Sequence, residues 1–381
     1  MGKATPHLGT IPQSCVREAP ISTRIAPARP ECAARRGVPA DYGTVAAWLF
    51  ACCGLIFLMI VVGGITRLTE SGLSITEWEP VTGIVPPFGH ARWLAEFARY
   101  KAIPQYRALH LGMSLDQFKT IFFWEYAHRL LGRLIGFAFA VPLVWFWWRG
   151  RLPRRLTPAL VGILGLGFAQ GLLGWYMVES GLAHRVEVSQ YRLVAHLGLA
   201  LAIYAAILWA ALDLARGEPR AVIGTLWRRA AEAVLLLVAL TIAAGGFVAG
   251  TRAGFVYNTF PLMGGRLVPA GYAELQPFMR NWFANVAAVQ FDHRLLAMTT
   301  AAAVVLLFAA GLRAGFPAAA RIALCALLAA LLLQVALGIS TLLLVVPIPL
   351  AAAHQAGAVL LLTAAIVFRH TLQPAAREAL R

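Results

Sequence analysis

The sequence predicts an all-α integral membrane protein with eight transmembrane helices, arranged as two four-helix bundles related by a pseudo-twofold axis. Composition is the first reason: 60% of the 381 residues are hydrophobic, only 13% are charged, and the mean hydropathy is +0.70. A soluble globular chain carries about 25% charged residues, so the composition excludes that class. The other two reasons are a series of apolar runs of membrane-spanning length and an internal repeat.

The N-terminal residues 1–44 are rich in Pro, Arg and Ala and show no apolar period. We predict a disordered basic tail. Because this tail has no apolar core, it is not a secretory signal peptide, whereas an organellar transit peptide stays open. The net charge of +16 does not indicate a nucleic-acid partner, because the basic residues cluster in short segments between apolar runs.

Eight apolar runs follow the tail, and each is close to the ~20 residues that cross a bilayer. They lie at 45–66, 121–148, 158–179, 190–213, 229–250, 286–311, 318–346 and 349–369. Lys and Arg gather in the short connections on one side, which predicts cytoplasmic termini and two long loops outside. We predict an N-terminal bundle at 45–213 and a C-terminal bundle at 229–370. A cytoplasmic linker at 214–228 joins them, and a cytoplasmic tail follows at 371–381.

The first outer loop, 67–120, contains a predicted helix. Trp93, Phe97 and Tyr100 recur at helical spacing beside basic residues, and this pattern fits a helix with one apolar face. Such a helix lies either on the membrane surface or against the protein, and the sequence leaves both readings open. Ser114 and Gln117 fit a capping box that starts the second membrane helix.

The third observation is that the chain consists of two similar halves. The segment 124–133 begins the second apolar run, and 290–296 repeats its His-Arg-Leu-Leu sequence 165 residues later. The further matches are Gln170 with Gln334, Gly174 with Gly338, His196 with His354, Gly63-Gly64 with Gly245-Gly246, and Arg67 with Arg252. Both halves start on the same side, so the predicted axis runs along the membrane normal.

Four of the histidines lie at one depth near the outer ends of the predicted helices. In an up-down-up-down bundle the second and fourth helices are diagonal, so His128 can face His196, and His293 can face His354. A pair of imidazoles on diagonal helices is suited to holding haem iron from both faces. Two alternatives stay open: interhelical hydrogen bonds, and zinc, which usually recruits more ligands than two.

Two arginines at outer helix ends, Arg67 and Arg252, are candidate contacts for haem propionates, because the guanidinium fork suits carboxylates. Snorkelling of both side chains to the interface is the alternative.

The halves differ at one position beside the histidines. Glu125 lies three residues before His128, on the same helix face and one turn nearer the outside, whereas the second half has neutral Gln290 there. A carboxylate at this depth is costly and indicates a function. We therefore interpret Glu125 as the catalytic residue of the first half, with a structural ion pair to Arg129 or Arg133 as the alternative.

With these residues in place, the chain resembles the haem A synthase family over about residues 45–370. The resemblance is carried by the segment 63–74 (GGITRLTESGLS), by 125–129 (EYAHR), and by His196, His293 and His354. It implies oxidation of the C8 methyl group of haem O to a formyl group by successive hydroxylations, for cytochrome oxidase assembly. It also implies a haem B held by His293 and His354, and haem O received by the first half.

The resemblance further implies a bacterial inner (cell) membrane location, with the mitochondrial inner membrane as the alternative, and haem O synthase as a partner besides membrane lipid. The electron donor is not identified, and homo-oligomer formation is left open. Many bacterial members carry a cysteine pair in the first outer loop, but this chain has none between residues 67 and 120. It therefore looks like the proteobacterial and mitochondrial subgroup, without a thiol relay in that loop.

Two other functions fit paired histidines. One is a di-haem b-type electron-transfer protein linked to quinol, and the other is a haem transporter. Neither explains why Glu125 is present in one half while Gln290 takes its place in the other.

Overall fold

The computed structural model describes residues 2, 40–78, 82–182, 185–215 and 224–373. All regular secondary structure in these ranges is helical, apart from one isolated bridge between Met263 and Arg266. The long helices are α1 (Ala40–Leu68), α4 (Leu115–Trp148), α5 (Thr157–Leu182), α6 (Gln190–Ala215), α7 (Thr225–Gly250), α9 (Val286–Gly311), α10 (Ala318–Leu343) and α11 (Ile348–Thr371). The shorter α-helices are α2 (His90–Ala102), α3 (Pro104–Leu109) and α8 (Asn281–Ala284), and the 3-10 turns are η1 (Thr82–Ile84), η2 (Ala253–Phe255) and η3 (Phe278–Arg280).

Eight helices within the described ranges are long and apolar enough to cross a membrane, which confirms the eight predicted runs. α1 begins at Ala40 rather than residue 45, and the rest of the predicted tail lies almost entirely outside the described residues. Ser114 caps α4, because its Oγ accepts from the Gln117 N–H while the Gln117 side chain accepts from the Ser114 N–H at 2.9 Å. The predicted capping box is therefore confirmed.

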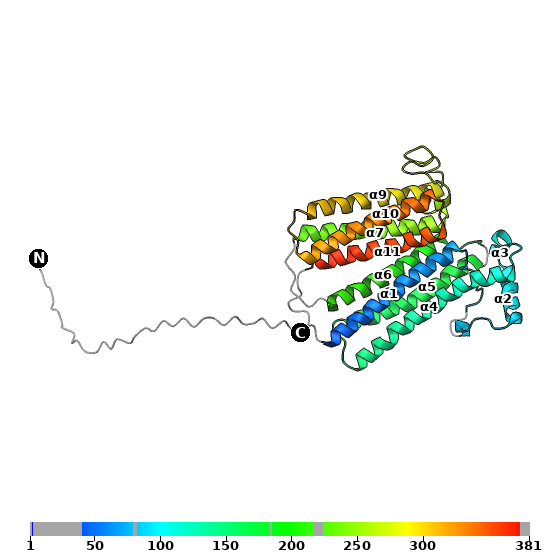
Figure 1. Cartoon of the computed structure of the whole chain (residues 1–381), viewed down its shortest axis with the longest axis horizontal. Helices are drawn as coiled ribbons and strands as arrows, with labels where there is room; N and C mark the ends of the chain where they lie inside the picture. The colour runs from blue at the N-terminus through cyan, green and yellow to red at the C-terminus, as the bar shows by residue number, and fades with distance from the viewer. Residues whose placement is uncertain (1, 3–39, 79–81, 183–184, 216–223, 374–381) are drawn as a thin grey trace. The chain divides into compact units, whose positions relative to one another are not determined.

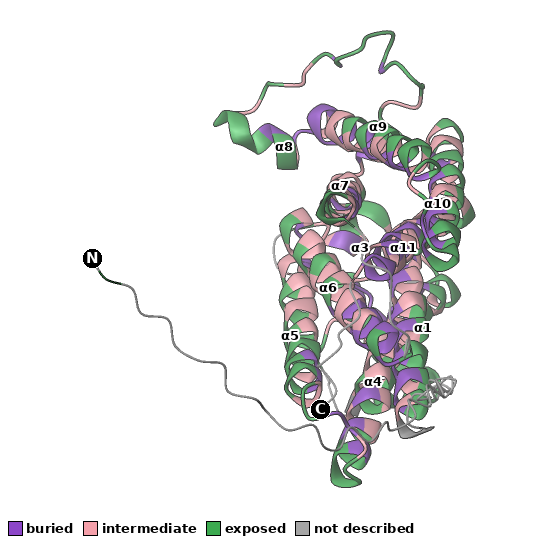
Figure 2. Cartoon of the chain, turned by 90° about the vertical axis from the view of Figure 1, so that its left-hand side faces the viewer, coloured by how far each residue is buried: buried purple, intermediate pink, exposed green. Residues whose placement is uncertain are grey.

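The long helices pack in two sets of four (Figures 1 and 2). In the first bundle the contacts run in a ring, α1 to α4, α4 to α5, α5 to α6 and α6 to α1, and in the second bundle they run from α7 to α9, α10, α11 and back. α4 and α6 are therefore diagonal in the first bundle, as α9 and α11 are in the second. These are the helices that carry the four histidines. The pseudo-twofold relation of the two bundles stays a prediction.

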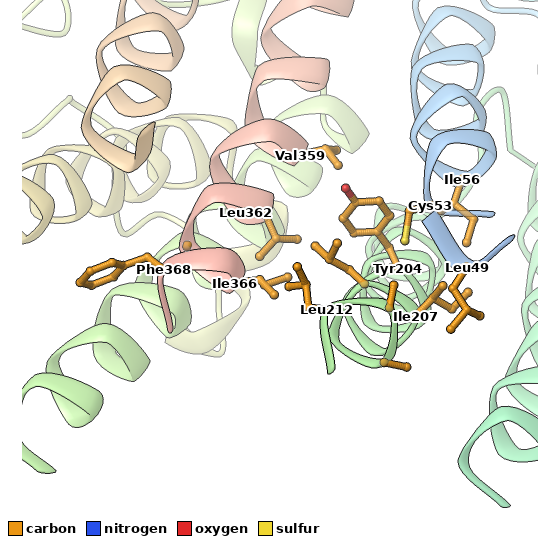
Figure 3. Packing of buried hydrophobic residues seen from close by; sticks show 14 of the residues in the cluster. Leu49, Cys53, Ile56, Tyr204, Ile207, Leu212, Val359, Leu362, Ile366 and Phe368 are labelled. Carbon is orange, nitrogen blue, oxygen red and sulfur yellow. The ribbon is translucent and has the colours of Figure 1, made fainter. Parts of the chain in front are cut away.

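The bundles meet along α1, α6, α7 and α11, where the main hydrophobic core lies. Figure 3 shows α1, α6 and α11 contributing to it, with Leu49, Ile207 and Ile366 among the fully buried side chains. Polar contacts also join the bundles here: the Tyr204 Oη lies 2.7 Å from the Thr363 Oγ1, and the Gln355 Nε2 donates to the Ile60 carbonyl oxygen at 2.8 Å. Burial of this apolar surface from both bundles holds them together as one compact unit from Gly37 onward.

Two loops, 69–114 and 251–285, lie at the same end of the long helices (Figure 1), which we call the loop end. In the first loop, Phe97 and Tyr100 of α2 are buried in a cluster with Phe118 and Phe122 of α4. The Phe97 and Phe118 rings stack with centroids 4.9 Å apart. The apolar face of α2 thus packs against the protein, and the membrane-surface reading of this face is wrong.

Candidate functional site

Each of the four membrane histidines lies against a glycine of the adjacent helix in its bundle. A Cβ atom added at these glycines would come within 2.8–3.0 Å of the imidazole Cε1, a distance that real Cβ atoms essentially never show. The pairs are Gly63 with His128, Gly174 with His196, Gly245 with His293 and Gly338 with His354. Glycine is thus required for each ring position. The repeat in the sequence contained these glycines, but not their role.

The histidines of each pair lie on diagonal helices, so His128 can face His196 across the first bundle and His293 can face His354 across the second. That each pair binds one iron stays a prediction. Within the described parts of the chain, no group of three or more His, Cys, Asp or Glu side chains could hold a metal ion. The donor set therefore fits two axial ligands per iron and does not fit the three or four ligands of a zinc site.

The histidines differ in what orients them. The Nδ1 of His293 lies 3.1 Å from the Thr241 carbonyl oxygen, which places the proton on Nδ1 and leaves Nε2 free to bind a metal. For His128, His196 and His354, Nδ1 is buried and has no partner among the described residues. Gln170 bridges α5 and α6, because its Nε2 donates to the His196 carbonyl oxygen at 3.0 Å.

Glu125 is buried, with 3% of its surface exposed. Its Oε2 accepts from the Ser74 hydroxyl at 2.7 Å and from the Ile75 N–H at 2.8 Å. Its Oε1 accepts from the Arg129 Nε at 3.1 Å and Nη2 at 2.6 Å. These four donors fill the roughly four lone-pair positions of a carboxylate. The ion pair with Arg129, our alternative interpretation, is thus present.

The second bundle repeats this arrangement without the charge. Arg294 donates to the carbonyl oxygens of Tyr257 and Thr259, as Arg129 donates to those of Ile75 and Glu77. Gln290 donates to the Tyr257 carbonyl oxygen at 3.1 Å and makes no ion pair with Arg294. Both arginines hold a loop over the end of their bundle. Sequence reasoning missed Ser74, although it lies in the segment 63–74 that carries the family resemblance.

The expected equivalence of Arg67 and Arg252 is wrong. Counted from the matched glycines, the position equivalent to Arg252 is Glu70, and both have a left-handed backbone, with φ of 54° and 56°. Glu70 and Arg252 form an ion pair of 2.5 Å. Glu187 pairs with both arginines and lies 2.6 Å from Arg67. Protein carboxylates thus bind the guanidinium groups that we predicted to contact propionates.

His110 belongs to this network, against the expectation of a solvated loop histidine. Its Nε2 lies 3.1 Å from the Glu70 carboxylate, and its Nδ1 lies 2.5 Å from the Tyr100 hydroxyl. Burial, reinforced by the negative charge of Glu70, raises the pKa of Tyr100. Of the other two loop histidines, His90 is exposed and His184 lies outside the described residues.

One difference between the bundles concerns space. Gly167 lies on the face of α5 that carries the buried Leu160 and Ile163 and the histidine partner Gly174. A Cβ at Gly167 would meet no atom of the described residues within 4 Å. The equivalent residue of α10 is Leu331, which is 3% exposed. The first bundle therefore has room, about 10 Å along the helix from Gly174, that a leucine fills in the second.

Comparison with known proteins assigns the chain to a family. The family model described as COX15-CtaA, cytochrome oxidase assembly protein, matches residues 46–366. A protein of Nitrosospira multiformis named haem A synthase is 52% identical over 332 residues, which are 86% of this chain and 93% of that protein. Proteins of the same name from Rhodospirillum centenum and Parvibaculum lavamentivorans are 52% and 49% identical, over 87% of this chain and 88% and 95% of their own lengths.

Proposed function

Because this chain belongs to the COX15-CtaA family of cytochrome oxidase assembly proteins, we propose that it is a haem A synthase, an oxidoreductase that converts haem O to haem A. The chemical change is oxidation of the C8 methyl group to a formyl group by successive hydroxylations. The observation that carries the proposal is a matched pair of histidine sites with a buried, ionised carboxylate beside only one of them. The near-full-length similarity to proteins named haem A synthase supports it.

His293 and His354 are proposed to hold a resident haem B. The hydrogen bond from the His293 Nδ1 to Thr241 supports this assignment, because such an outer contact fixes the ring orientation and raises ligand basicity. Haem B supplies a one-electron redox centre when bound. The close packing around this site, with Leu331 in place of Gly167, suits a cofactor that stays.

His128 and His196 are proposed to receive haem O. Neither Nδ1 has a partner in the part of the chain that the structure describes, so neither ring is held by the kind of outer contact that orients His293. Haem O carries a long isoprenoid tail, and the space beside Gly167 supports placing the larger molecule in this bundle. The tail is apolar and can lie among helices or in lipid at no solvation cost.

Glu125 is proposed as the catalytic residue of the first bundle. Since four donors surround its oxygens, accepting a proton would require one of them to leave. The geometry therefore favours a fixed negative charge that stabilises positive charge developing at the ring edge. Ser74 and Arg129 hold the carboxylate in position. Arg67 and Arg252 are engaged with Glu187 and Glu70, so we do not assign them to propionates.

The setting follows from the same proposal. The chain is a multi-pass membrane protein, and we place it in the bacterial inner membrane with cytoplasmic termini. Haem O comes from haem O synthase, and an external redox partner must balance the four electrons that haem O loses when its methyl group becomes a formyl group. The parts 45–213 and 229–370 then correspond to the substrate and cofactor halves.

The test is coexpression with a haem O-producing enzyme, followed by chromatography of the haems extracted from membranes and from the purified protein. We expect haem A in the membranes, and haem B with substoichiometric haem O or A in the protein. Two equivalents of tightly held haem B and no haem A would instead establish a di-haem electron carrier. The same cells with an empty vector are the control.

A further inference from the structure

The loop 251–285 exposes a set of apolar side chains that no described part of the protein covers. Leu267 is 81% exposed and Met279 is 62% exposed. Others that are more than a third exposed are Val268, Phe278, Trp282, Phe260 and Leu262. Two exposed arginines, Arg266 and Arg280, stand directly beside these residues in the chain. Apolar and aromatic side chains beside Arg are typical of segments at a membrane–water interface.

The position of the loop matches that composition. Figure 1 draws it beside the right-hand end of α9 rather than beyond it, and Figure 2 shows that α8 and the loop reach sideways past the packed helices. The 26 residues of α9 span about 39 Å, whereas the hydrocarbon core of a bilayer is about 30 Å thick. The first turns of α9 therefore lie at headgroup depth, and so does a loop beside them.

The protein holds this loop in a fixed orientation. The Tyr272 hydroxyl donates to Asp292 of α9 at 2.9 Å. The Phe283 ring packs on Phe247 of α7 with centroids 5.2 Å apart. These contacts anchor the loop to α7 and α9 while its apolar side chains stay exposed.

We propose that the loop 251–285 is seated in the headgroup layer of the bilayer, with Leu267 and Met279 against the upper acyl chains and Arg266 and Arg280 at lipid phosphates. Lipid is the occupant because the loop is continuous with α9, whose exposed Leu295 and Met298 face lipid in a spanning helix. The first loop differs, since α2 buries its aromatic face on α4. The inference is independent of the proposed enzymatic function.

The experiment places an NBD fluorophore on single cysteines in a chain whose five native cysteines are replaced, reconstituted in nanodiscs with one protein each. The probe positions are Leu267→Cys and Met279→Cys. Met298→Cys, at an exposed position in the middle of α9, reports the acyl-chain interior. Asp116→Cys, at a side chain 89% exposed at the loop end of α4, reports water. Lipids with a nitroxide at the headgroup side or deep in the acyl chain supply the quenchers.

We expect the labels at Leu267 and Met279 to emit at shorter wavelength than the label at Asp116. Shallow nitroxides should quench them more than deep ones, with the reverse order at Met298. Emission and quenching equal to those at Asp116 would mean that water covers the loop and would overturn the proposal. Shielded labels that no nitroxide lipid quenches would also overturn it, because a protein surface would then cover them. Haem binding of each variant, measured by absorbance, shows that the chain is folded.

Discussion

The two bundles share one ligand geometry and differ in how tightly they are filled around it. Every glycine in the described membrane helices of the second bundle has a neighbouring side chain within 4 Å of a Cβ position, whereas several glycines of the first bundle have none. These open positions are Gly43, Gly54, Gly136, Gly162, Gly165, Gly167, Gly171 and Gly198. All of them are exposed, so glycine leaves open positions on the helix surfaces of the first bundle, whereas in the second bundle it serves close packing.

The same contrast holds at the loop end. Arg129 and Arg294 make equivalent contacts to loop carbonyl oxygens, but only Arg129 meets a carboxylate. The loop-holding role is therefore common to both bundles, and Glu125 adds something that this role does not need. An ion pair alone explains how the charge is tolerated, but it does not explain why one bundle has it.

The largest expected effect comes from removing each ligand pair. In the His293→Ala, His354→Ala variant the resident haem B loses both axial ligands, so we expect its absorbance band and its stoichiometry to fall to background. The matched His128→Ala, His196→Ala variant should keep haem B and lose haem A formation. Absorbance spectra and extracted haems measure both. If the first variant kept normal haem B, the assignment of the two bundles would be reversed or wrong.

The next effect is that of the charge. Glu125→Gln copies Gln290, keeps most hydrogen-bonding capacity and removes the negative charge. We expect haem B to be retained, haem O or a hydroxylated intermediate to accumulate, and the rate of haem A formation to fall by about 10²–10³, as for loss of one preorganised electrostatic contact. Ser74→Ala, which removes one donor to the carboxylate, should lower the rate less.

Gln290→Glu is the matched control in the other bundle. It places a carboxylate beside Arg294 without touching the proposed substrate site, so haem A formation should persist. Undiminished haem A formation by Glu125→Gln would show that Glu125 has a structural role. The difference between Glu125 and Gln290 would then not indicate catalysis.

A smaller effect should follow from filling the space in the first bundle. Gly167→Leu copies Leu331 and fills an open position, because no described atom lies within 4 Å of a Cβ there. We expect a higher KM for haem O, unchanged haem B and a smaller change in kcat. Leu331→Gly is the reciprocal control and should weaken haem B retention without changing the KM. Equal KM values for Gly167→Leu and the natural chain would show that the space is not used by substrate.

The sequence predicted the elements that depend on local physics. Apolar runs of about 20 residues gave all eight spanning helices, because backbone groups in lipid must be satisfied within a helix. Ser114 and Gln117 gave the start of α4. The histidines lie on the second and fourth apolar runs of each half, and these helices are diagonal in an up-down-up-down bundle.

The sequence did not predict contacts between residues of different helices and loops, which depend on how these elements pack. The four Gly–His contacts join separate helices, and glycine has many other uses in membrane helices. Arg67 and Arg252 were matched by residue type, whereas backbone geometry matches Arg252 with Glu70. His110 has polar neighbours far away in the chain, so a loop position alone suggested a solvated side chain. Contacts between loop residues leave no periodic pattern in the sequence from which they could be predicted.

The smallest expected effect concerns the ion pair between Glu70 and Arg252, which occupy equivalent positions in the two bundles. Glu70 and Arg252 form an ion pair whose side chains are 26% and 36% exposed, so water screens it and the pair should contribute about 1 kcal/mol at most. A double-mutant cycle with Glu70→Gln and Arg252→Gln, measured by thermal unfolding in nanodiscs, isolates the coupling. We expect a small positive coupling that declines with salt, and the Glu70→Arg, Arg252→Glu exchange should recover part of it. Glu187 and His110 also contact this pair, so the exchange should recover less than the full value. A coupling of zero would mean that this ion pair does not help to hold the two bundles together. The left-handed backbone at Glu70 and Arg252 would then reflect only a turn that both bundles share.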